Sequence, residues 1–434
     1  MAIGLWCSLG LLVLMVLRVP IAIALIVTAT GGIWLVQGSF AAWFQIAGAP
    51  LNSTTYGLSV IPLFVLMGNL AVHAGLSRDL FVLIARAIGR LKGGLAVATI
   101  LGCAGFSALS GSSLATAATM GRVTLGEMTG RGYSRRLAAG SIAAGGTIGI
   151  LIPPSVILAI YALMTEQSIR TMFAAGLLPG LLLTAVFVIT VLIWVRLSPG
   201  AAPVTADAGA LMREEASLVG VLSLLGLIVL VLGGLYGGLF TPTEAAAVGS
   251  LGTFVIAWAR GGLTRETLRE AMVGTATTSA MIFLIIIGST LYGTFLTVTG
   301  IAGALRGFLL GLDASPMTIL VVILLIYVLL GFVMDSLGML LLTLPVLFPI
   351  VTQLGIDPVL FGVLVVMTVE LGLITPPLGM NVFVVRAISR EISLTEVFAG
   401  SLPFAVSFVV AIAAVLMVPE LATWLPDLLY PAGR

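Results

Sequence analysis

Two short polar segments interrupt an otherwise apolar sequence, and their side chains are of the kind that bind small cations. The first segment is SGSS at 110–113, and the second is DSLG at 335–338. Hydroxyl, carbonyl and carboxylate oxygens are hard ligands that suit sodium, whereas the N-termini of helices favour an anion. Asp335 is the strongest single candidate, because an ionised carboxylate in a membrane interior is costly and usually functional. We predict that each segment is the tip of a re-entrant hairpin and that the two tips form one ion and substrate site.

A proline pair follows each polar segment at the same distance. The pairs occupy 153–154 and 376–377, and each pair begins 41 residues beyond its polar segment, counted from Ser112 and from Asp335. A proline removes a backbone donor and clashes with the preceding turn, so the pairs predict broken helices at 152–154 and 375–377. A bilayer tolerates such breaks only where protein or water satisfies the freed backbone groups. We therefore expect the breaks and the hairpin tips to meet near the middle of the membrane.

The amino-acid composition indicates that these segments belong to an integral membrane protein. The chain has 434 residues, of which 60% are hydrophobic and 8% are charged, and its mean hydropathy is +1.25. Apolar runs of about 20 residues recur along the chain, whereas barrel strands would give short alternating segments. We predict an all-α integral membrane protein with about 10–12 transmembrane helices. The net charge of +2 is too small and too dispersed to indicate a nucleic-acid partner.

The second half of the chain repeats features of the first half. Four glycine or proline markers recur at offsets between 220 and 224 residues. Basic residues gather in 78–92 and 122–136 but are scarce in the corresponding segments 299–314 and 348–358. Because basic residues mark the cytoplasmic side, we predict two inverted-topology repeats, with both termini periplasmic and the linker 197–215 cytoplasmic.

Each repeat is expected to contain a scaffold arm followed by a transport core. The predicted arms are residues 1–56 and 216–272, and the predicted cores are 57–196 and 273–420. The re-entrant hairpins are expected at about 93–126 in the first core and about 315–352 in the second.

Several polar residues also have a structural interpretation. Asp335 can be a solvated helix cap near the surface, and the serine-rich tip can serve close helix packing. Glu370 lies just before the second break and can support it through hydrogen bonds. Glu244 fits the first turn of a helix, where the dipole favours a carboxylate. His73 is the only histidine, and its apolar neighbours favour a structural role at the membrane interface over a proton relay.

Five motifs resemble those of a known transporter family. They are SGSSLATA at 110–117, EM at 127–128 with RGY at 131–133, GGTIGILIPPS at 145–155, FTPTEAAA at 240–247 and GLITPPLGMN at 372–381. Together they resemble the large membrane subunit of tripartite ATP-independent periplasmic (TRAP) transporters, and the resemblance covers nearly the whole chain. It implies the ion-transporter-superfamily fold and sodium-coupled uptake of an organic acid, such as a dicarboxylate, across the bacterial inner membrane by an elevator movement. It also implies two protein partners, a separate small four-helix membrane subunit and a periplasmic substrate-binding protein, with sodium as the coupling ion and no cofactor.

The same resemblance implies particular site residues. Sodium is expected at Ser110, Gly111, Ser112, Ser113, Thr147 and Gly149 in one site, and at Asp335, Ser336, Gly372 and Thr375 in the other. The expected substrate-binding residues are Ser112, Ser113, Pro153, Pro154, Pro376, Pro377 and Asn381. Substrate identity is not encoded in these motifs, because the binding protein largely selects it.

Other functions remain as alternatives at this stage. A stand-alone sodium or proton symporter of the same broad fold, such as a dicarboxylate carrier, would need no small subunit. An ion channel would need a continuous polar pore, and a membrane enzyme would need a catalytic cluster; the sequence offers neither of these features. It also contains no GxxxxGK[ST] loop for binding a nucleotide, so we expect an ion gradient to supply the energy and no enzymatic activity.

Overall fold

The computed structural model describes residues 2–17, 19–53, 55–89, 91–203, 217–311, 314–331 and 334–431. Within these ranges the regular elements are all helices, as predicted. Six of them are long and apolar enough to cross a membrane, namely the helical segments Tyr56–His73, Ile169–Leu197, Leu218–Tyr236, Arg265–Val298, Ser336–Gln353 and Leu394–Met417. Five shorter apolar helices of 10–17 residues accompany them. The predicted number of about 10–12 transmembrane helices is therefore reached only if these shorter helices also cross the bilayer.

The first half of the chain contains ten α-helices in the described ranges. They are α1 (Ala2–Val16), α2 (Ile21–Gln37), α3 (Ser39–Ser53), α4 (Val60–His73), α5 (Leu76–Ile88), α6 (Gly94–Ser110), α7 (Ser113–Gly130), α8 (Arg135–Thr147), α9 (Val156–Met164) and α10 (Ile169–Leu197). Three short 3-10 helices join them, η1 (Tyr56–Ser59), η2 (Ile148–Ile150) and η3 (Pro199–Ala201).

The second half contains ten further described α-helices. They are α12 (Leu218–Tyr236), α13 (Pro242–Ala259), α14 (Arg265–Val298), α15 (Ile301–Leu310), α16 (Pro316–Leu330), α17 (Ser336–Gln353), α18 (Pro358–Gly372), α19 (Met380–Ile388), α20 (Leu394–Met417) and α21 (Glu420–Leu429). Their order matches the first half: helices α5 to α10 begin 222 to 225 residues before helices α15 to α20. The repeated order is therefore present in the helices, while the opposite membrane orientation of the halves stays a prediction.

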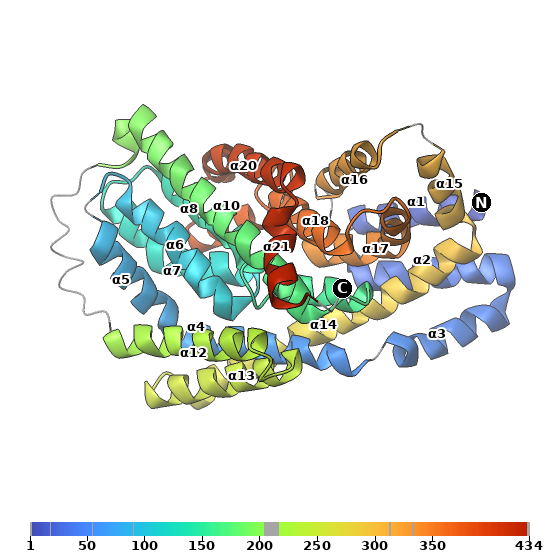
Figure 1. Cartoon of the computed structure of the whole chain (residues 1–434), viewed down its shortest axis with the longest axis horizontal. Helices are drawn as coiled ribbons and strands as arrows, with labels where there is room; N and C mark the ends of the chain where they lie inside the picture. The colour runs from blue at the N-terminus through green and yellow to red at the C-terminus, as the bar shows by residue number, and fades with distance from the viewer. Residues whose placement is uncertain are drawn as a thin grey trace.

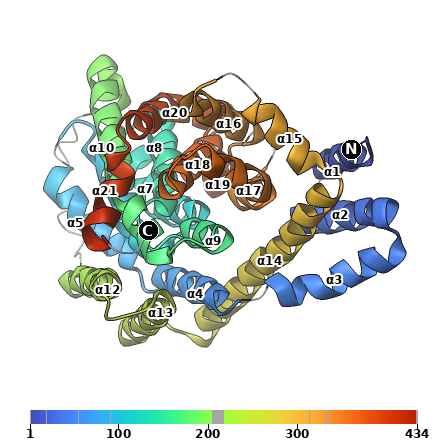
Figure 2. The same cartoon turned by 45° about the vertical axis from the view of Figure 1, so that its right-hand side comes forward.

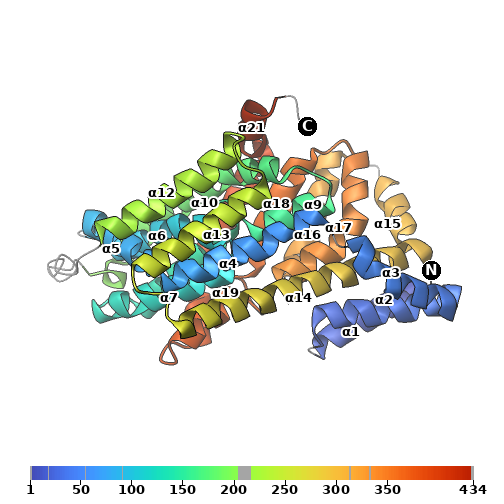
Figure 3. The same ribbon diagram turned by 90° about the horizontal axis from the view of Figure 1, so that it is seen from below.

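The outer helices of the two halves pack against each other. Helix α14 lies along α2 and crosses α4, and α13 packs on α4. Figures 1 and 2 show α1, α2 and α3 at one end of the molecule, with α14 running from them toward α13. Figure 3 shows α12, α13 and α4 side by side. At the start of α5 an ion pair joins this layer to the core, because Arg260 Nη2 lies 2.5 Å from Asp79 Oδ2.

The inner helices of the two halves meet through small residues. Helix α8 packs closely along α20. At their contact, a Cβ atom on Gly140 would lie 2.1 Å from the carbonyl oxygen of Gly400, and a Cβ on Gly400 would lie 2.1 Å from that of Arg136. Glycine at both positions lets the two backbones touch, which is a common way of holding helices together in membranes.

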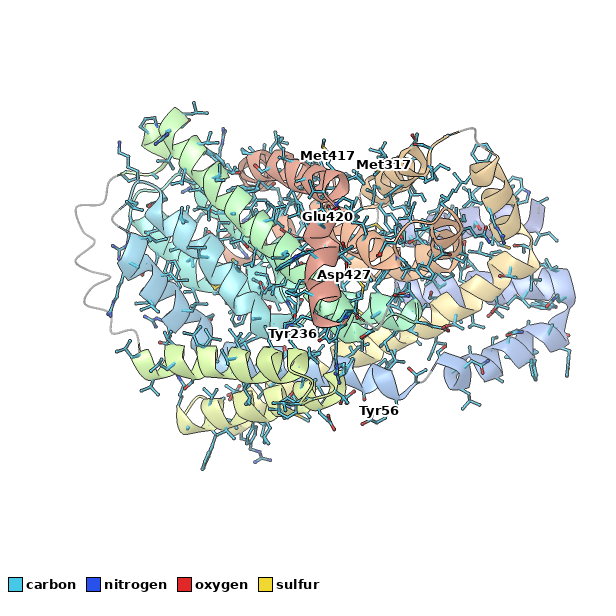
Figure 4. The ribbon with its side chains drawn as sticks, viewed as in Figure 1. Tyr56, Tyr236, Met317, Met417, Glu420 and Asp427 are labelled. Carbon is cyan, nitrogen blue, oxygen red and sulfur yellow. The ribbon has the colours of Figure 1, made fainter. Side chains whose placement is uncertain are left out.

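The chain ends with a short helix that turns back across the bundle. Figure 4 shows Met417 and Glu420 at the junction between α20 and α21, with Asp427 farther along α21. Helix α21 packs on α10 and α18.

Two of the predicted domain boundaries fall at or near described helices. The predicted division between 216–272 and 273–420 falls inside α14, which is continuous over 34 residues. The first half breaks between α3 and α4 at the corresponding place, and α3 contains Pro50, whereas α14 contains no proline. Most of the predicted linker 197–215 lies outside the described residues, which end at 203 and resume at 217.

Candidate functional site

Helices α6 and α7 meet at the segment that the sequence predicts to be the first hairpin tip. Helix α6 ends at Ser110, and Gly111 then adopts a left-handed φ of 56°. Ser112 caps the N-terminus of α7 by accepting a hydrogen bond from the Ala115 amide at 3.4 Å. The Ser110 and Thr116 hydroxyls lie 2.6 Å apart, so they also hydrogen-bond across the tip. These local contacts hold the hydroxyls of the tip in fixed positions.

The second hairpin tip is formed by the start of α17. Asp335 caps this helix by accepting a hydrogen bond from the Gly338 amide at 3.4 Å. The capping role considered from the sequence is therefore present, and Asp335 is only partly exposed. It lines the same cavity as the first hairpin tip.

Each helix break packs against the hairpin tip of its own half. In the first half, the Val156 amide donates to the Gly111 carbonyl at 3.3 Å. In the second half, a Cβ on Gly372 would lie only 3.0 Å from the Cα of Gly331, the residue that follows α16. Backbone groups freed at the second break also find partners, since the Ile374 carbonyl accepts from the Ser401 hydroxyl at 2.8 Å. The breaks are thus supported by protein, as a bilayer requires.

Glu370 joins the two halves at the centre of this arrangement. It lies near the end of α18, and its side chain is fully buried. One carboxylate oxygen accepts a hydrogen bond from the Ser113 hydroxyl, and the other accepts one from the Ser336 hydroxyl at 3.3 Å. A single carboxylate therefore connects the first residues of α7 and α17, which belong to different repeats.

A cavity of about 340 Å³ lies beside these hairpin tips. The first residues of four helices line it: Ser113 of α7, Val156 of α9, Ser336 of α17 and Met380 of α19. Helix N-termini carry partial positive charge and free amide groups, so their convergence favours an anion. No lysine, arginine or histidine is among the described residues that line the cavity.

The opposite ends of other helices also reach this cavity. Ser110 ends α6, Ile150 ends η2, and Leu373 follows the last residue of α18. The C-terminal ends of helices present carbonyl groups with partial negative charge, which favour a cation. The cavity therefore has one set of groups suited to an anion and another suited to a cation.

The structure brings six of the predicted site residues together in the cavity lining. They are Ser110, Gly111, Ser112, Ser113, Asp335 and Ser336. The remaining predicted residues lie outside that lining, namely Thr147, Gly149, Pro153, Pro154, Gly372, Thr375, Pro376, Pro377 and Asn381. Pro153 and Pro154 are buried, whereas Pro376 and Pro377 are exposed.

Of these outer residues, Gly149 contacts the first tip, whereas the hydroxyls of Thr147 and Thr375 bond locally, to carbonyls three or four residues earlier. The Thr147 hydroxyl donates to the Ala144 carbonyl at 2.6 Å within its own helix. A Cβ on Gly149 would lie 2.8 Å from the Ser112 carbonyl, so this glycine packs directly against the first tip. The Thr375 hydroxyl donates to the Leu371 carbonyl at 3.1 Å.

Asn381 makes a contact between the two halves. Its side chain is fully buried, and its amide nitrogen donates to the Ala143 carbonyl of α8 at 3.1 Å. Its side-chain oxygen has no hydrogen-bond partner among the described residues. Asn381 thus holds the start of α19 against α8.

The sequence interpretation did not identify the cavity residues on α4 and α14. Asn69 and Thr278 line the cavity, and Asn69 also donates to the Thr275 hydroxyl at 3.0 Å across the two helices. An asparagine within an apolar segment was a signal, because polar side chains in membrane helices usually have a defined partner.

Two other polar residues considered in the sequence lie away from the cavity. Glu244 forms a capping box with Thr241 at the start of α13, and the hydrogen bonds from Thr241 lower the pKa of this exposed carboxyl. His73 is partly exposed at the end of α4, with its Nε2 atom 4.0 Å from a carboxylate oxygen of Glu270.

Comparison with known proteins identifies relatives along nearly the whole chain. The family described as "Tripartite ATP-independent periplasmic transporter, DctM component" matches residues 9–421. The C4-dicarboxylate TRAP transporter large permease protein DctM of Vibrio cholerae is 33% identical over 96% of each chain. The sialic acid TRAP transporter large permease protein SiaM of the same organism is 31% identical, covering 98% of this chain and 99% of the relative. The isethionate TRAP transporter permease protein DctMQ of Oleidesulfovibrio alaskensis is 34% identical, covering 87% of this chain and 59% of the relative.

Solved structures of transporters share the fold. The YdaH transporter of Alcanivorax borkumensis superimposes with a TM-score of 0.65 over 89% of each chain, at 15% identity. MtrF of Neisseria gonorrhoeae superimposes with a TM-score of 0.67 over 94% of each chain, at 13% identity. At these identities the comparison shows a shared all-α fold.

Proposed function

The chain belongs to the DctM-component family of tripartite ATP-independent periplasmic transporters, and from this premise we propose that it imports a small organic acid coupled to sodium. Members of this family are large permease subunits and multi-pass inner-membrane proteins, so the chain is a permease rather than an enzyme. Three features go beyond membership of the family: the substrate, the coupling ion and the movement of the transport core.

The observation that carries the proposal is the convergence of four helix N-termini on a cavity whose described lining residues include no cationic side chain. A carboxylate or sulfonate is stabilised there by the helix dipoles and by those amides of the first turns that the caps do not engage. The printed names of three relatives assign them C4-dicarboxylates, sialic acid and isethionate. All three are acids that ionise at neutral pH, which fits this kind of cavity.

Sodium is the coupling ion in this proposal. The Asp335 carboxylate, the serine hydroxyls of both tips and the carbonyl ends of α6 and α18 supply hard oxygen ligands beside the anion site. A bound cation would offset the charge of Asp335 and of the substrate in a region of low dielectric. Cation and anion would therefore each favour binding of the other.

The packing of the helices supports a proposal for the movement. Helices α6 to α9 and α16 to α19 contact one another around the cavity, whereas α2, α13, α14 and α4 pack on one another outside them, with α4 touching α6 and α14 touching α17. We assign the inner group to a mobile transport core and the outer layer to a scaffold, so that the core and its cavity move as an elevator. A periplasmic binding protein would deliver the substrate, and a small membrane subunit would join the scaffold.

The test is uptake into proteoliposomes that contain this chain, the small subunit and the binding protein. Radiolabelled C4-dicarboxylates, sialic acid and isethionate are offered separately, with and without an inward sodium gradient. Uptake of one of these acids that requires the sodium gradient and all three proteins is the expected result.

Other results would change the proposal in defined ways. Equal uptake with a proton gradient and no sodium would overturn sodium coupling. Uptake by this chain alone would overturn the tripartite assignment in favour of a stand-alone symporter.

A further inference from the structure

A second pocket lies at the end of α10, separate from the transport cavity. Its volume is about 590 Å³, and it shares no lining residue with that cavity. Two cationic residues, Lys92 and Arg196, line it together with aliphatic side chains that include Leu91, Ile189, Leu192 and Ile193. This combination of positive charge and hydrocarbon wall differs from the polar cavity at the hairpin tips.

The pocket is built by a close approach of the loop between α5 and α6 to α10. Gly93 has a left-handed φ of 78°, and a Cβ there would lie 2.9 Å from Val195 Cγ2 and 3.3 Å from Val191 Cγ1. Because glycine has no side chain and adopts this φ without strain, the loop reaches the helix surface. The neighbouring Lys92 is thereby placed in the same pocket as Arg196.

The other side of the pocket is also anchored. Pro199 lines it and starts η3, which follows α10. The Ala201 carbonyl at the end of η3 accepts a hydrogen bond from the Ser134 amide at 2.9 Å. This bond fixes the segment after α10 against the turn between α7 and α8.

The positive charge of the pocket is not balanced within the described protein. No aspartate or glutamate is among its lining residues, and neither Lys92 nor Arg196 has an ion-pair partner in the described ranges. Two cations close to one surface attract an anion, and an anion with several acceptor oxygens can bind both.

The apolar wall indicates which kind of anion is suited. Leu91 is 61% exposed, and Ile189 and Ile193 are each 53% exposed, on or beside a helix long and apolar enough to span the membrane. A free inorganic anion gains nothing from such a surface, whereas a hydrocarbon chain packs on it. The two halves of the pocket therefore match a molecule with an anionic head and an apolar tail.

We propose that this pocket binds an anionic phospholipid, with its phosphate between Lys92 and Arg196 and its acyl chains along the aliphatic surface of α10. Basic pockets beside membrane helices, on the side where basic loops gather, bind such headgroups. The segment 78–92, which includes most of α5 and the residues after it, is one of those that the sequence predicts to be cytoplasmic. The lipid would hold the α5–α6 loop to the end of α10 and so brace this end of the core.

Native mass spectrometry of the full-length chain, purified with its small subunit, tests the proposal. Phosphatidylglycerol and phosphatidylcholine with identical acyl chains are titrated separately, and bound lipid is counted. We expect a phosphatidylglycerol site that the double variant K92Q/R196Q weakens about 30-fold, since each basic residue near an anionic headgroup contributes about fivefold in affinity.

Two control variants distinguish the loss of this lipid site from a general loss of positive charge. R265Q/R269Q removes two exposed positive charges at the start of α14, away from the pocket, and should leave the phosphatidylglycerol site intact. K92R/R196K keeps both charges and should bind within about threefold of the unmodified chain. This conservative variant also keeps the test informative if the neutral variant folds poorly.

Three outcomes would overturn the proposal. They are equal binding of phosphatidylcholine, equal weakening by R265Q/R269Q, and displacement of the lipid by millimolar inorganic phosphate. The last result would identify a site for a free anion.

Discussion

The Ser113 hydroxyl donates a hydrogen bond to the Glu370 carboxylate, although the two residues are 257 positions apart in the chain. Ser113 begins α7 in the first repeat, and Glu370 lies near the end of α18 in the second. The same carboxylate accepts from Ser336 at the start of α17. The positions of both hairpin tips beside the transport cavity therefore depend on one buried side chain.

We predict that Glu370→Gln lowers sodium-driven uptake about tenfold or more. The amide keeps the shape of the side chain, but it replaces one acceptor oxygen with a donor that faces a serine hydroxyl. A buried donor or acceptor left without its partner costs about 1–3 kcal/mol, and the middle of that range corresponds to about a thirtyfold change in an equilibrium. The initial uptake rate is measured as a function of sodium concentration, at equal amounts of protein in the membrane.

The role of Glu370 as a link between tips is tested by a double-mutant cycle. Ser113→Ala and Ser336→Ala each remove one donor, and their effects on half-maximal sodium concentration should not be additive, because they share one acceptor. Additive effects, or unchanged uptake in Glu370→Gln, would contradict the predicted link.

Asp335→Asn is predicted to abolish sodium-driven uptake while leaving the fold almost unchanged. Asparagine and aspartate cap helix N-termini about equally well, so α17 keeps its cap. The substitution removes only the negative charge that we assign to the cation. Uptake and the thermal unfolding midpoint are measured together, and Asp335→Ala should lower the midpoint as well, since it loses a cap worth about 1 kcal/mol.

Asp357→Asn is the matched control for Asp335. Asp357 caps α18 by accepting hydrogen bonds from the Val359 and Leu360 amides at 2.8 and 3.0 Å, and it does not line the cavity. Its substitution should leave uptake near the unmodified level. If both asparagine variants lost uptake equally, the charge of Asp335 would have no special role.

The hairpin tips and helix breaks could be predicted from the sequence because their causes are local. Gly111 supplies the left-handed turn, Ser112 supplies a helix cap, and each proline pair interrupts a helix wherever it occurs. The composition likewise settles the all-α membrane class. None of these features depends on which distant segments of the chain pack together.

The contacts between repeats could not be predicted in the same way. Nothing near Glu370 in the sequence indicates that its partners are Ser113 and Ser336, because those contacts depend on how the halves are packed. The continuity of α14 across residue 272 is a second feature that the sequence repeat did not indicate. Repeat symmetry indicates equivalent segments, but the absence of proline lets α14 continue where the first half breaks.

Adding a single methyl group at the contact between α8 and α20 is expected to lower the stability of the fold strongly. Gly140→Ala places a Cβ where only 2.1 Å separates it from the Gly400 carbonyl, so the helices must move apart. Overpacking of this kind typically costs about 1–3 kcal/mol. The thermal unfolding midpoint of the purified chain should fall clearly.

Gly126→Ala provides the control for this prediction. Gly126 lies within α7, and a Cβ there would meet no atom within 4 Å. Alanine favours the helix over glycine by about 1 kcal/mol, so this variant should be neutral or slightly more stable. Equal destabilisation by both substitutions would show that the close contact at Gly140 is not the cause.

The ion pair between Asp79 and Arg260 is predicted to hold the start of α5 to the end of α13. The pair is 2.5 Å long, the Asp79 side chain is largely buried, and Asp79 also accepts a hydrogen bond from the Ser217 amide at 3.4 Å. Asp79→Asn leaves the guanidinium without its partner and should destabilise the chain by about 1–3 kcal/mol, less than a fully buried pair because Arg260 is partly exposed. The double variant D79N/R260Q removes both charges, and its loss of stability should be smaller than the sum of the single losses, since no charge is left unpaired. Thermal unfolding midpoints of the four proteins in the same detergent measure this coupling, and additive losses would mean that the pair contributes no mutual stabilisation.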